Sequence, residues 1–365
     1  MKQPDAVESS SNSDRIRLTS HGQKTGFRGR ILGLVAVGAL TAAAVVTSFL
    51  PSPNEVPAQA ADRGPAAELK IGYFANLTHA PALISESEGI LQKHLDEDGT
   101  KFQSQIFNAG PAAVEALNSG AIDAAYLGPN PALNSYLSSH GESLNIVSGV
   151  AYGGASLVVN KDITKPEQLA GSNLASPQFG GTQDVALRNY LKELDLKQDA
   201  TVTPSSNGTV AQLFGRGEID GAWLPEPYAS LLIEKNDAHR LVNEAQLWPE
   251  GKFPTTVLVV SKEFMASHPD TVQKLVDANT EAIEWLNNAD EKQKLSAVQK
   301  ALVKANGSSF DESVIAQALK QVHFSQDPLP ETYQTLVDHA LAVEVGAGGN
   351  ADGLVDSRFL EQQEQ

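Results

Sequence analysis

A short pattern that occurs twice constrains the fold of this chain more than any other feature. Gly-x-Ile-Asp-x-Ala-Tyr-Leu covers residues 120–127, and Gly-x-Ile-Asp-x-Ala-Trp-Leu covers residues 217–224, 97 positions later. Each copy ends a helix with glycine, enters a buried strand and stops at a turn that contains proline. The repeat predicts two similar α/β half-domains that face each other across a cleft. Chance agreement between helix-stop and strand-start signals is the alternative.

Strands and helices alternate along most of the chain, and helical periodicity dominates its C-terminal third. The expected strands are residues 69–73, 102–107, 121–127, 146–150, 156–160, 173–175 and 255–260, with a further strand in 194–203. Such alternation predicts an α/β fold with parallel-rich sheets. Several of the strands end in polar loops at a helix start, and in open α/β sheets ligands bind at that edge.

The order of the segments predicts a chain that begins one lobe, builds a second and returns to finish the first. We expect lobe 1 to comprise residues 68–155 and 252–365, and lobe 2 to comprise residues 156–251. The two crossings, near residues 151–158 and 250–256, would form a hinge.

The first 60 residues are predicted to direct export. Residues 1–30 are polar, end in a basic cluster and are expected to be disordered on the cytoplasmic side. Residues 31–50 carry no charge and are long enough to span about 30 Å of hydrocarbon as a helix. An Ala-x-Ala site at 58–60 favours cleavage of a signal peptide, with retention as a membrane anchor as the alternative, and residues 61–67 form a linker. We expect an exported protein, periplasmic or on the cell surface.

Charge and cysteine content exclude several functions. The chain has a formal net charge of −17, and residues 61–365 alone carry −19, because the first 60 residues hold six basic and four acidic groups. This acidity argues against nucleic acid or an anionic membrane surface as a partner. The chain has no cysteine, which excludes disulfides, thiolate metal sites and a cysteine nucleophile. Since known catalytic and metal-binding motifs are also absent from the sequence, we expect no catalytic centre, cofactor or metal.

Residues 176–191 carry the clearest candidate for a binding site. The sequence Ser-Pro-Gln-Phe-Gly-Gly-Thr-Gln-Asp-Val-Ala-Leu-Arg-Asn-Tyr-Leu passes from a strand through Gly180 and Gly181 into a helix that Thr182 is predicted to cap. The free amides and positive dipole end of such a helix can hold an anion. An ordinary capped turn is the alternative.

Four other residues have two interpretations each. His79 could donate to a ligand or face water, and Arg188 could reach an anion or pair with Asp184 four residues earlier. Trp223 could stack on a ligand or fill the core. Glu226 at the cleft edge would repel an anion, unless the ligand carries an ammonium group or Glu226 pairs with a residue across the hinge.

Five segments, in the same order along the chain, resemble the ABC-transporter substrate-binding proteins for aliphatic sulfonates, taurine and nitrate. They are Ile-Gly-Tyr-Phe-Ala-Asn-Leu-Thr-His-Ala-Pro-Ala-Leu (71–83), and residues 107–117, 120–132, 176–188 and 221–228. The resemblance covers roughly residues 68–290. It implies a two-lobed type II periplasmic-binding-protein fold of the α/β class, with a ligand cleft between the lobes and C-terminal helices. It also implies capture of a small organic anion, an aliphatic sulfonate in the first instance and taurine or nitrate as alternatives, and its delivery to a membrane permease by a monomeric protein.

The resemblance places ligand contacts in several loops. They fall on Asn76, Thr78, His79, Gly110, Gly128, Asn130, Gly154, Gly180, Gly181, Thr182, Gln183 and Glu226. Gly181 stands where the family pattern has Asn, which removes one side-chain donor. Enzymes of thiamine-pyrimidine synthesis share this fold and are the main alternative, but the resemblance there involves a cysteine-rich iron motif that this sequence lacks. An anchored sensor domain is a third interpretation.

Overall fold

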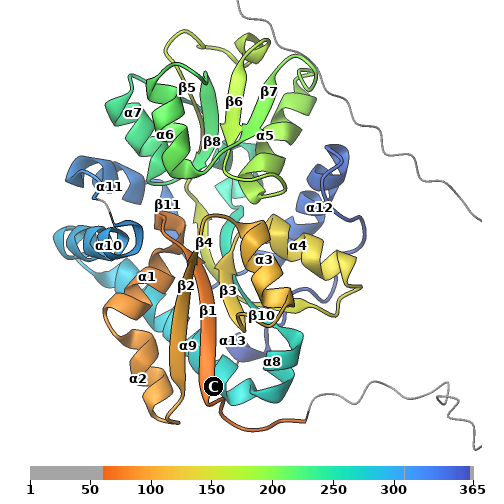
Figure 1. Ribbon diagram of the computed structural model, residues 1–365, viewed down its shortest axis with the longest axis vertical. Coiled ribbons are helices and arrows are strands. Elements are labelled where there is room, and N and C mark those ends of the chain that lie inside the picture. The colour runs from red at the N-terminus through yellow and green to blue at the C-terminus, as the bar shows by residue number, and fades with distance from the viewer. Residues whose placement is uncertain (1–60, 308, 362–365) are drawn as a thin grey trace, which may run out of the picture. The chain divides into compact units, whose positions relative to one another are not determined.

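Two mixed β-sheets organise the computed structural model, which describes residues 61–307 and 309–361 (Figure 1). The six-stranded sheet has the order β11-β4-β10-β3-β1-β2, and the five-stranded sheet has the order β7-β6-β8-β5-β9. The strands of the first sheet are β1 (Glu68–Phe74), β2 (Lys101–Phe107), β3 (Ala124–Leu127), β4 (Leu144–Gly153), β10 (Pro254–Ser261) and β11 (Val322–Phe324). Those of the second are β5 (Ala155–Val159), β6 (Asn173–Ser176), β7 (Thr201–Pro204), β8 (Gly221–Pro225) and β9 (His239–Asn243). We call the six-stranded sheet with its helices lobe 1 and the five-stranded sheet with its helices lobe 2.

The repeated sequence pattern corresponds to a repeated arrangement of strands. β1 pairs in parallel with β2 and β3, and β6 pairs in parallel with β7 and β8. Asp123 donates its amide to the carbonyl of Lys70 at 2.8 Å, and its carboxylate accepts the Lys70 amide at 2.8 Å. Asp220 makes the same two bonds with Asn173, at 2.7 and 2.8 Å. The prediction of two similar half-domains is therefore confirmed.

The prediction that the sheets are rich in parallel pairs is wrong. Of the nine strand pairings among the described residues, five are antiparallel, and they involve β4, β5 and β10. β4 carries the chain towards lobe 2, and β10 brings it back beside β4 in the opposite direction. Strands that leave and re-enter a lobe side by side must run antiparallel, and strand-helix alternation alone does not reveal this.

The crossing from lobe 1 to lobe 2 is a single residue long. Gly154 separates β4 from β5, and both Gly153 and Gly154 have positive φ, at 71° and 74°. A Cβ at Gly154 would lie 2.5 Å from a methyl group of Val322, so a side chain is excluded there. The return crossing lies alongside, where the Thr255 hydroxyl donates to the Gly153 carbonyl.

Helices cover both faces of each sheet. Along β1, Leu69, Ile71 and Tyr73 belong to one core and Phe74 to another, as expected for a strand buried on both sides. The helices of lobe 1 before the crossing are α1 (Ala80–Ser87), α2 (Ile90–Asp96), α3 (Gly110–Asn118) and α4 (Pro129–Ser138), with the 3-10 turn η1 (Leu77–His79) ahead of α1. Those of lobe 2 are α5 (Thr182–Glu193), α6 (Asn207–Gly215) and α7 (Tyr228–Lys235), with η2 (Pro166–Leu169), η3 (Glu244–Leu247) and η4 (Pro249–Gly251).

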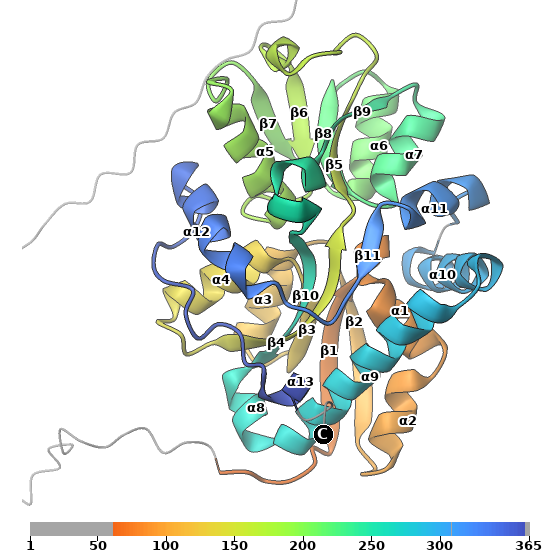
Figure 2. The same cartoon turned by 180° about the vertical axis from the view of Figure 1, so that it is seen from behind.

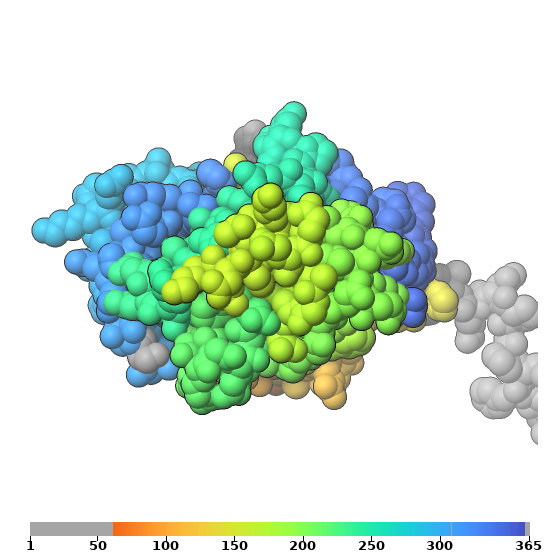
Figure 3. All heavy atoms as spheres, turned by 90° about the horizontal axis from the view of Figure 1, so that it is seen from above, coloured from red at the N-terminus to blue at the C-terminus, as the bar shows by residue number. Residues whose placement is uncertain are grey.

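The C-terminal third is helical, as expected, but it also returns to lobe 2. Its elements are α8 (Lys262–Ser267), α9 (Pro269–Asn288), α10 (Glu291–Asn306), α11 (Glu312–Leu319), η5 (Pro330–Thr332), α12 (Tyr333–Ala342) and α13 (Arg358–Glu361). α8, α9, α10 and α13 pack on lobe 1, whereas α11 also contacts α7 of lobe 2, and α12 contacts both α4 and α5 (Figure 2). In the view onto lobe 2, residues of this C-terminal third are visible on both sides of the lobe (Figure 3). The C-terminal segment therefore bridges the two sheets.

The predicted targeting segment, residues 1–60, lies outside the described residues. In the described part, no helix is both long and apolar enough to cross a membrane. Residues 61–361 belong to one compact unit, so the predicted lobe boundaries stay a prediction.

Candidate functional site

Loops from both lobes meet around a small cavity at the helix starts. The cavity has a volume of about 30 Å³. Eight of the predicted contact residues line it, namely Asn76, Thr78, His79, Gly110, Gly128, Gly181, Thr182 and Gln183. We call it the cleft cavity. The starts of α3, α4, α5 and α6 converge here, so four positive dipole ends point to one place.

Thr182 joins the two lobes, although not in the predicted way. The N-cap of α5 is Gly181, in an extended conformation, and Thr182 is the first helical residue, so the prediction of Thr182 as the cap is wrong. The Thr182 hydroxyl instead accepts a hydrogen bond from the amide of Asn130, at the start of α4, at 3.4 Å. A Cβ at Gly128 would lie 2.3 Å from this hydroxyl. The lobes therefore approach as closely as they do because residue 128 has no side chain.

The glycine loop supplies fewer donors than the sequence suggests. The Gly181 amide donates to the carbonyl of Gln178 at 3.0 Å, and the Gly180 amide donates to the carboxylate of Asp184 at 3.0 Å. Both amides therefore stabilise the loop itself. The amides of Thr182 and Gln183 lie in the first turn of α5, where backbone N–H groups have no partner within the helix. They are the donors that α5 can offer to an anion.

Asn76 and Thr78 form a hydrogen-bonded chain with Thr256 on the returning strand β10. The Thr256 hydroxyl donates to Thr78 Oγ1 at 2.9 Å, and the Thr78 hydroxyl donates to Asn76 Oδ1 at 2.9 Å. Asn76 Oδ1 also accepts the Thr78 amide, which caps η1. Because Oδ1 accepts both bonds, the amide Nδ2 group is what Asn76 can present to a ligand.

His79 is a neutral donor at this site. Its Nδ1 accepts the amide of Phe74 at 3.2 Å, so the ring carries its proton on Nε2. The side chain is buried, and burial lowers the pKa of His79 from 6.5 to about 3. At neutral pH the ring can therefore donate one hydrogen bond but carries no charge.

Glu226 is not part of the cleft cavity. Its carboxylate is fully buried, pairs with the Arg240 guanidinium at 2.9 Å and accepts the Ser230 amide at 3.0 Å. Burial raises the pKa of Glu226, while the bonds from Ser230 and Arg240 act in the opposite direction. Its carbonyl accepts the Leu77 amide at 2.9 Å and so links lobe 2 to lobe 1. The negative charge that would repel an anion is thus paired within lobe 2, and the prediction of a partner across the hinge is wrong.

Arg188 and Trp223 have structural roles. Arg188 pairs with Asp184 at 2.9 Å, and its guanidinium lies 5.2 Å from the ring centre of Phe179. Asp184 also accepts the Ser176 hydroxyl at 2.6 Å, which holds the loop before α5 in place. Trp223 is buried in the core of lobe 2 and donates its indole N–H to Glu244 at 2.6 Å.

Three predicted residues lie outside the cleft cavity in addition to Glu226. Gly154 lies at the crossing between the lobes, and Asn130 and Gly180 line a second, larger cavity. Sequence reasoning missed other lining residues, namely Phe74, Asn108, Ala109, Pro131, Pro177, Gln178, Asn207, Pro225 and Thr255. Asn108 directly follows β2, and Asn207 follows β7, its counterpart in the repeat, after two residues. Their shared position after equivalent strands was the signal that could have identified them.

The described lining of the cleft cavity is polar but uncharged. It includes neither lysine nor arginine, nor any carboxylate, serine or cysteine. Within the described residues, no group of three or more metal-ligating side chains comes together. The arrangement can hold an anion through neutral N–H and O–H donors at helix starts.

Comparisons with known proteins agree with this architecture. Residues 62–300 match the model of the NMT1-like family. The taurine-binding periplasmic protein of Escherichia coli (strain K12) is 27% identical over 203 residues, which are 55% of this chain and 62% of that protein. The match thus spans less than two thirds of that relative's length.

Solved structures of binding proteins share the fold. The alkanesulfonate-binding protein SsuA from Xanthomonas axonopodis pv. citri, bound to MOPS, has a TM-score of 0.66 at 22% identity, over 78% of this chain and 96% of that one. The periplasmic nitrate-binding protein NrtA from Synechocystis PCC 6803 has a TM-score of 0.65 at 14% identity, over 76% of this chain and 82% of that one. The predicted periplasmic-binding-protein fold is confirmed. Since the family model covers well over half of its residues, this chain belongs to the NMT1-like family.

Proposed function

We propose that this protein is the solute-binding component of an ABC importer and that it captures a small organic anion, an aliphatic sulfonate in the first instance. The observation that carries the proposal is the convergence of neutral donors from both lobes on the cleft cavity. Lobe 1 contributes His79 and Asn76, and lobe 2 contributes the first-turn amides of α5. The similarity to taurine- and alkanesulfonate-binding proteins supports the same class of ligand.

Closure of the lobes accounts for binding without covalent chemistry. A ligand that contacts donors of both lobes binds the closed arrangement more tightly than the open one. This difference in binding free energy is the amount by which the ligand shifts the equilibrium towards the closed arrangement. Neutral donors suit an acidic protein, because helix dipoles and hydrogen bonds act at short range whereas a net charge of −17 repels anions at long range. The closed form would then be recognised by the permease.

Titration calorimetry of the purified full chain tests this function. Methanesulfonate, ethanesulfonate, taurine, nitrate, sulfate and a thiamine pyrimidine precursor are compared at one pH and one salt concentration. The proposal predicts saturable binding of at least one sulfonate. Binding of the pyrimidine precursor with no response to any oxyanion would contradict it.

A further inference from the structure

The helix α12 holds together two helices whose starts line the cleft cavity. α12 contacts both α4 and α5, and these two helices also meet each other through Asn130 and Thr182. Figures 1 and 2 show α12 at one side of the molecule, where the two lobes meet. A helix that packs on both α4 and α5 can control how closely their starts approach.

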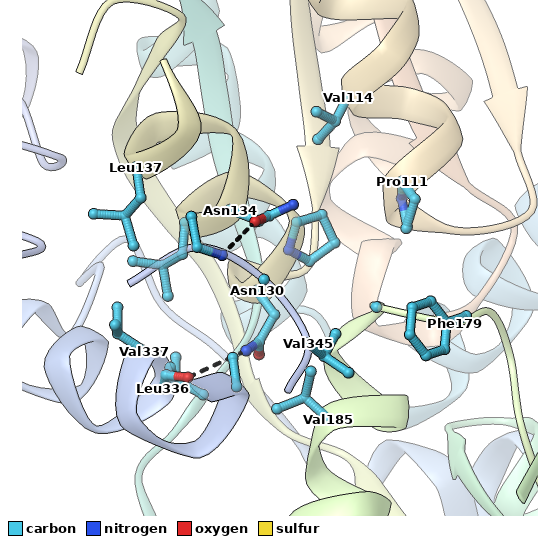
Figure 4. A pocket seen from close by; sticks show the side chains of 16 residues that line it. Pro111, Val114, Asn130, Asn134, Leu137, Phe179, Val185, Leu336, Val337 and Val345 are labelled. Atoms are coloured by element: carbon cyan, nitrogen blue, oxygen red, sulfur yellow. Dashed lines mark hydrogen bonds between the residues drawn. The ribbon is translucent and has the colours of Figure 1, made fainter. Parts of the chain in front are cut away.

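On lobe 1, α12 is anchored by buried side chains and by hydrogen bonds. Leu336 and Val337 belong to a core of lobe 1 to which α4 also contributes. The Nδ2 group of Asn130 donates to the Leu336 carbonyl at 3.4 Å, and the side-chain oxygen of Asn134 accepts the Ala347 amide at 2.8 Å (Figure 4). Because this core is close-packed, α12 moves with lobe 1.

On lobe 2, the end of α12 meets α5 along a small apolar seam. Val185 of α5 packs with Ala340, Val343 and Val345, and all four side chains are buried. Figure 4 shows Val185 and Val345 close to each other. The seam is separate from the cores of the two lobes. Its burial therefore depends on the lobes being together, and separation of the lobes would expose apolar surface to water.

Two lysines of lobe 2 bond to the same segment. Lys192, in the last turn of α5, donates to the Ala342 carbonyl at 2.7 Å, and Lys197 pairs with the Glu344 carboxylate at 2.9 Å. Glu344 has a φ of 62° directly after the C-cap of α12, a position and a conformation that favour glycine. The chain thus places a carboxylate that reaches lobe 2 where glycine would be less strained.

We propose that residues 333–345, which we call the latch, hold α5 against α4 before a ligand arrives. This inference rests on the proposed function, because lobe closure is what the latch controls. Val185, Val343 and Glu344 are positioning residues in this account, since none of them lines the cleft cavity. The ligand-free protein is then closed for part of the time. The apparent dissociation constant equals the intrinsic one divided by this closed fraction, so the latch raises affinity without contacting the ligand.

The closed fraction of the ligand-free protein tests the latch directly. Lys93→Cys on lobe 1 and Lys161→Cys on lobe 2 give the cysteine-free chain two sites for spin labels. Electron-electron double resonance on the full chain should show a short-distance component beside a longer one. Val343→Ser and Val185→Ser should each reduce the short component by at least about threefold, because the seam loses apolar burial. Leu341→Ser is the control and should leave it unchanged, since Leu341 is 45% exposed and lies outside the seam.

A charge reversal tests the latch without any change to a buried side chain. Lys197 and Glu344 are 38% and 83% exposed, so substitutions there leave the cores of both lobes intact. Lys197→Glu should lower the short component by about twofold, the small effect expected of an exposed ion pair. Addition of Glu344→Lys to this variant should restore the component, because the pair is then re-formed with its charges exchanged.

Ligand binding separates this inference from the proposed function. Calorimetry compares methanesulfonate, ethanesulfonate and taurine on the unmodified chain and on Val343→Ser, and we expect affinity to fall by the same factor for each compound that binds. The inference would be overturned by a ligand-free protein without a short component. It would also be overturned by a short component of equal size in the unmodified protein, Val343→Ser, Val185→Ser and Lys197→Glu. Failure of every sulfonate to bind would overturn the proposed function, whereas the ligand-free distances would still decide on the latch.

Discussion

The hydroxyl of Thr182 in lobe 2 accepts a hydrogen bond from the backbone amide of Asn130 in lobe 1 at 3.4 Å. Each residue lies in the first turn of a helix, α5 and α4, whose dipole end faces the other lobe. The hydroxyl oxygen of Thr182 is thus the acceptor for a backbone amide at the start of α4. An oxygen atom of a bound anion would satisfy the same donors, and this is the basis of the proposed capture by closure.

Gly128→Ala should weaken ligand binding by preventing this approach of the lobes. The new Cβ would lie 2.3 Å from Thr182 Oγ1 and 3.2 Å from Thr182 Cβ, so the helix starts must move apart. We expect affinity for a sulfonate, measured by calorimetry, to fall by at least about tenfold, which corresponds to 1.4 kcal/mol. Gly208→Ala is the control, because a Cβ at that position would have no atom within 4 Å apart from its chain neighbours and the backbone of its own helix. Unchanged affinity in Gly128→Ala would show that closure does not depend on this contact.

Thr182→Ala should reduce ligand affinity, whereas Thr182→Ser should preserve most of it. The alanine variant loses one hydroxyl from the cleft cavity, and a single hydrogen bond contributes about 0.5–1.5 kcal/mol. We therefore expect a loss of roughly two- to tenfold in the association constant. Equal losses in the two variants would assign the effect to packing of the methyl group and not to the hydroxyl.

Anion affinity should be nearly independent of pH between 6 and 8. His79 has a pKa lowered to about 3 by burial, so it stays neutral in this range and donates through Nε2. A tenfold gain in affinity as the pH falls through 6.5 would instead mean that a charged imidazolium binds the anion. Calorimetric titrations at several pH values distinguish the two cases.

Burial of His79 should also make stability sensitive to acid. The unfolded chain takes up a proton near pH 6.5 and the folded protein only near pH 3, so the contribution of His79 is complete above pH 6.5 and declines as the pH falls towards 3. Between these two pH values, the contribution of His79 to the free energy of unfolding falls by about 1.4 kcal/mol for each pH unit. Urea denaturation is measured for the full chain and for His79→Gln. Below pH 6, the free energy of unfolding should fall less in the variant than in the unmodified protein. Parallel declines would contradict the assignment of a neutral, buried ring.

Arg240→Met should destabilise the protein, and Glu226→Gln should leave ligand binding intact. Removal of Arg240 leaves the buried Glu226 carboxylate without its positively charged partner, so that only the bond from the Ser230 amide remains. Such a change costs about 3–5 kcal/mol, and we expect the lower end because Arg240 is 23% exposed. Denaturation midpoints and calorimetry measure the two effects separately. Loss of binding in Glu226→Gln at unchanged stability would instead place its carboxylate in contact with the ligand.

The sequence predicted the paired half-domains because the same short pattern, with Asp123 in one copy and Asp220 in the other, leads into equivalent strands. Each aspartate bonds to the neighbouring parallel strand in the same way. It did not predict the antiparallel pairings, because they depend on which strands lie side by side after the chain crosses between lobes. The partner of Glu226 was also hidden, since Glu226 directly follows β8 whereas Arg240 lies on β9, and β5 lies between these two strands in the sheet.

The site was predictable only in part, for the same reason. The residues at helix starts were recognisable from glycine, proline and threonine positions. The use of the Gly180 and Gly181 amides within their own loop depends on the place of Asp184 and Gln178 in three dimensions. The lining that residues 336–347 contribute to the second, larger cavity depends on packing between segments far apart in the chain.

The central claim, that a small organic anion closes the two lobes, is tested most directly by a distance between them. Because the chain has no cysteine, Lys93→Cys on α2 and Lys161→Cys after β5 provide one labelling site on each lobe. Both lysine side chains are more than 70% exposed, at 73% and 71%. Electron-electron double resonance on the spin-labelled full chain should show a broad distance distribution without ligand and a narrower, shorter one with a saturating alkanesulfonate. A distribution that stays the same when calorimetry shows the sulfonate to be bound would contradict the account.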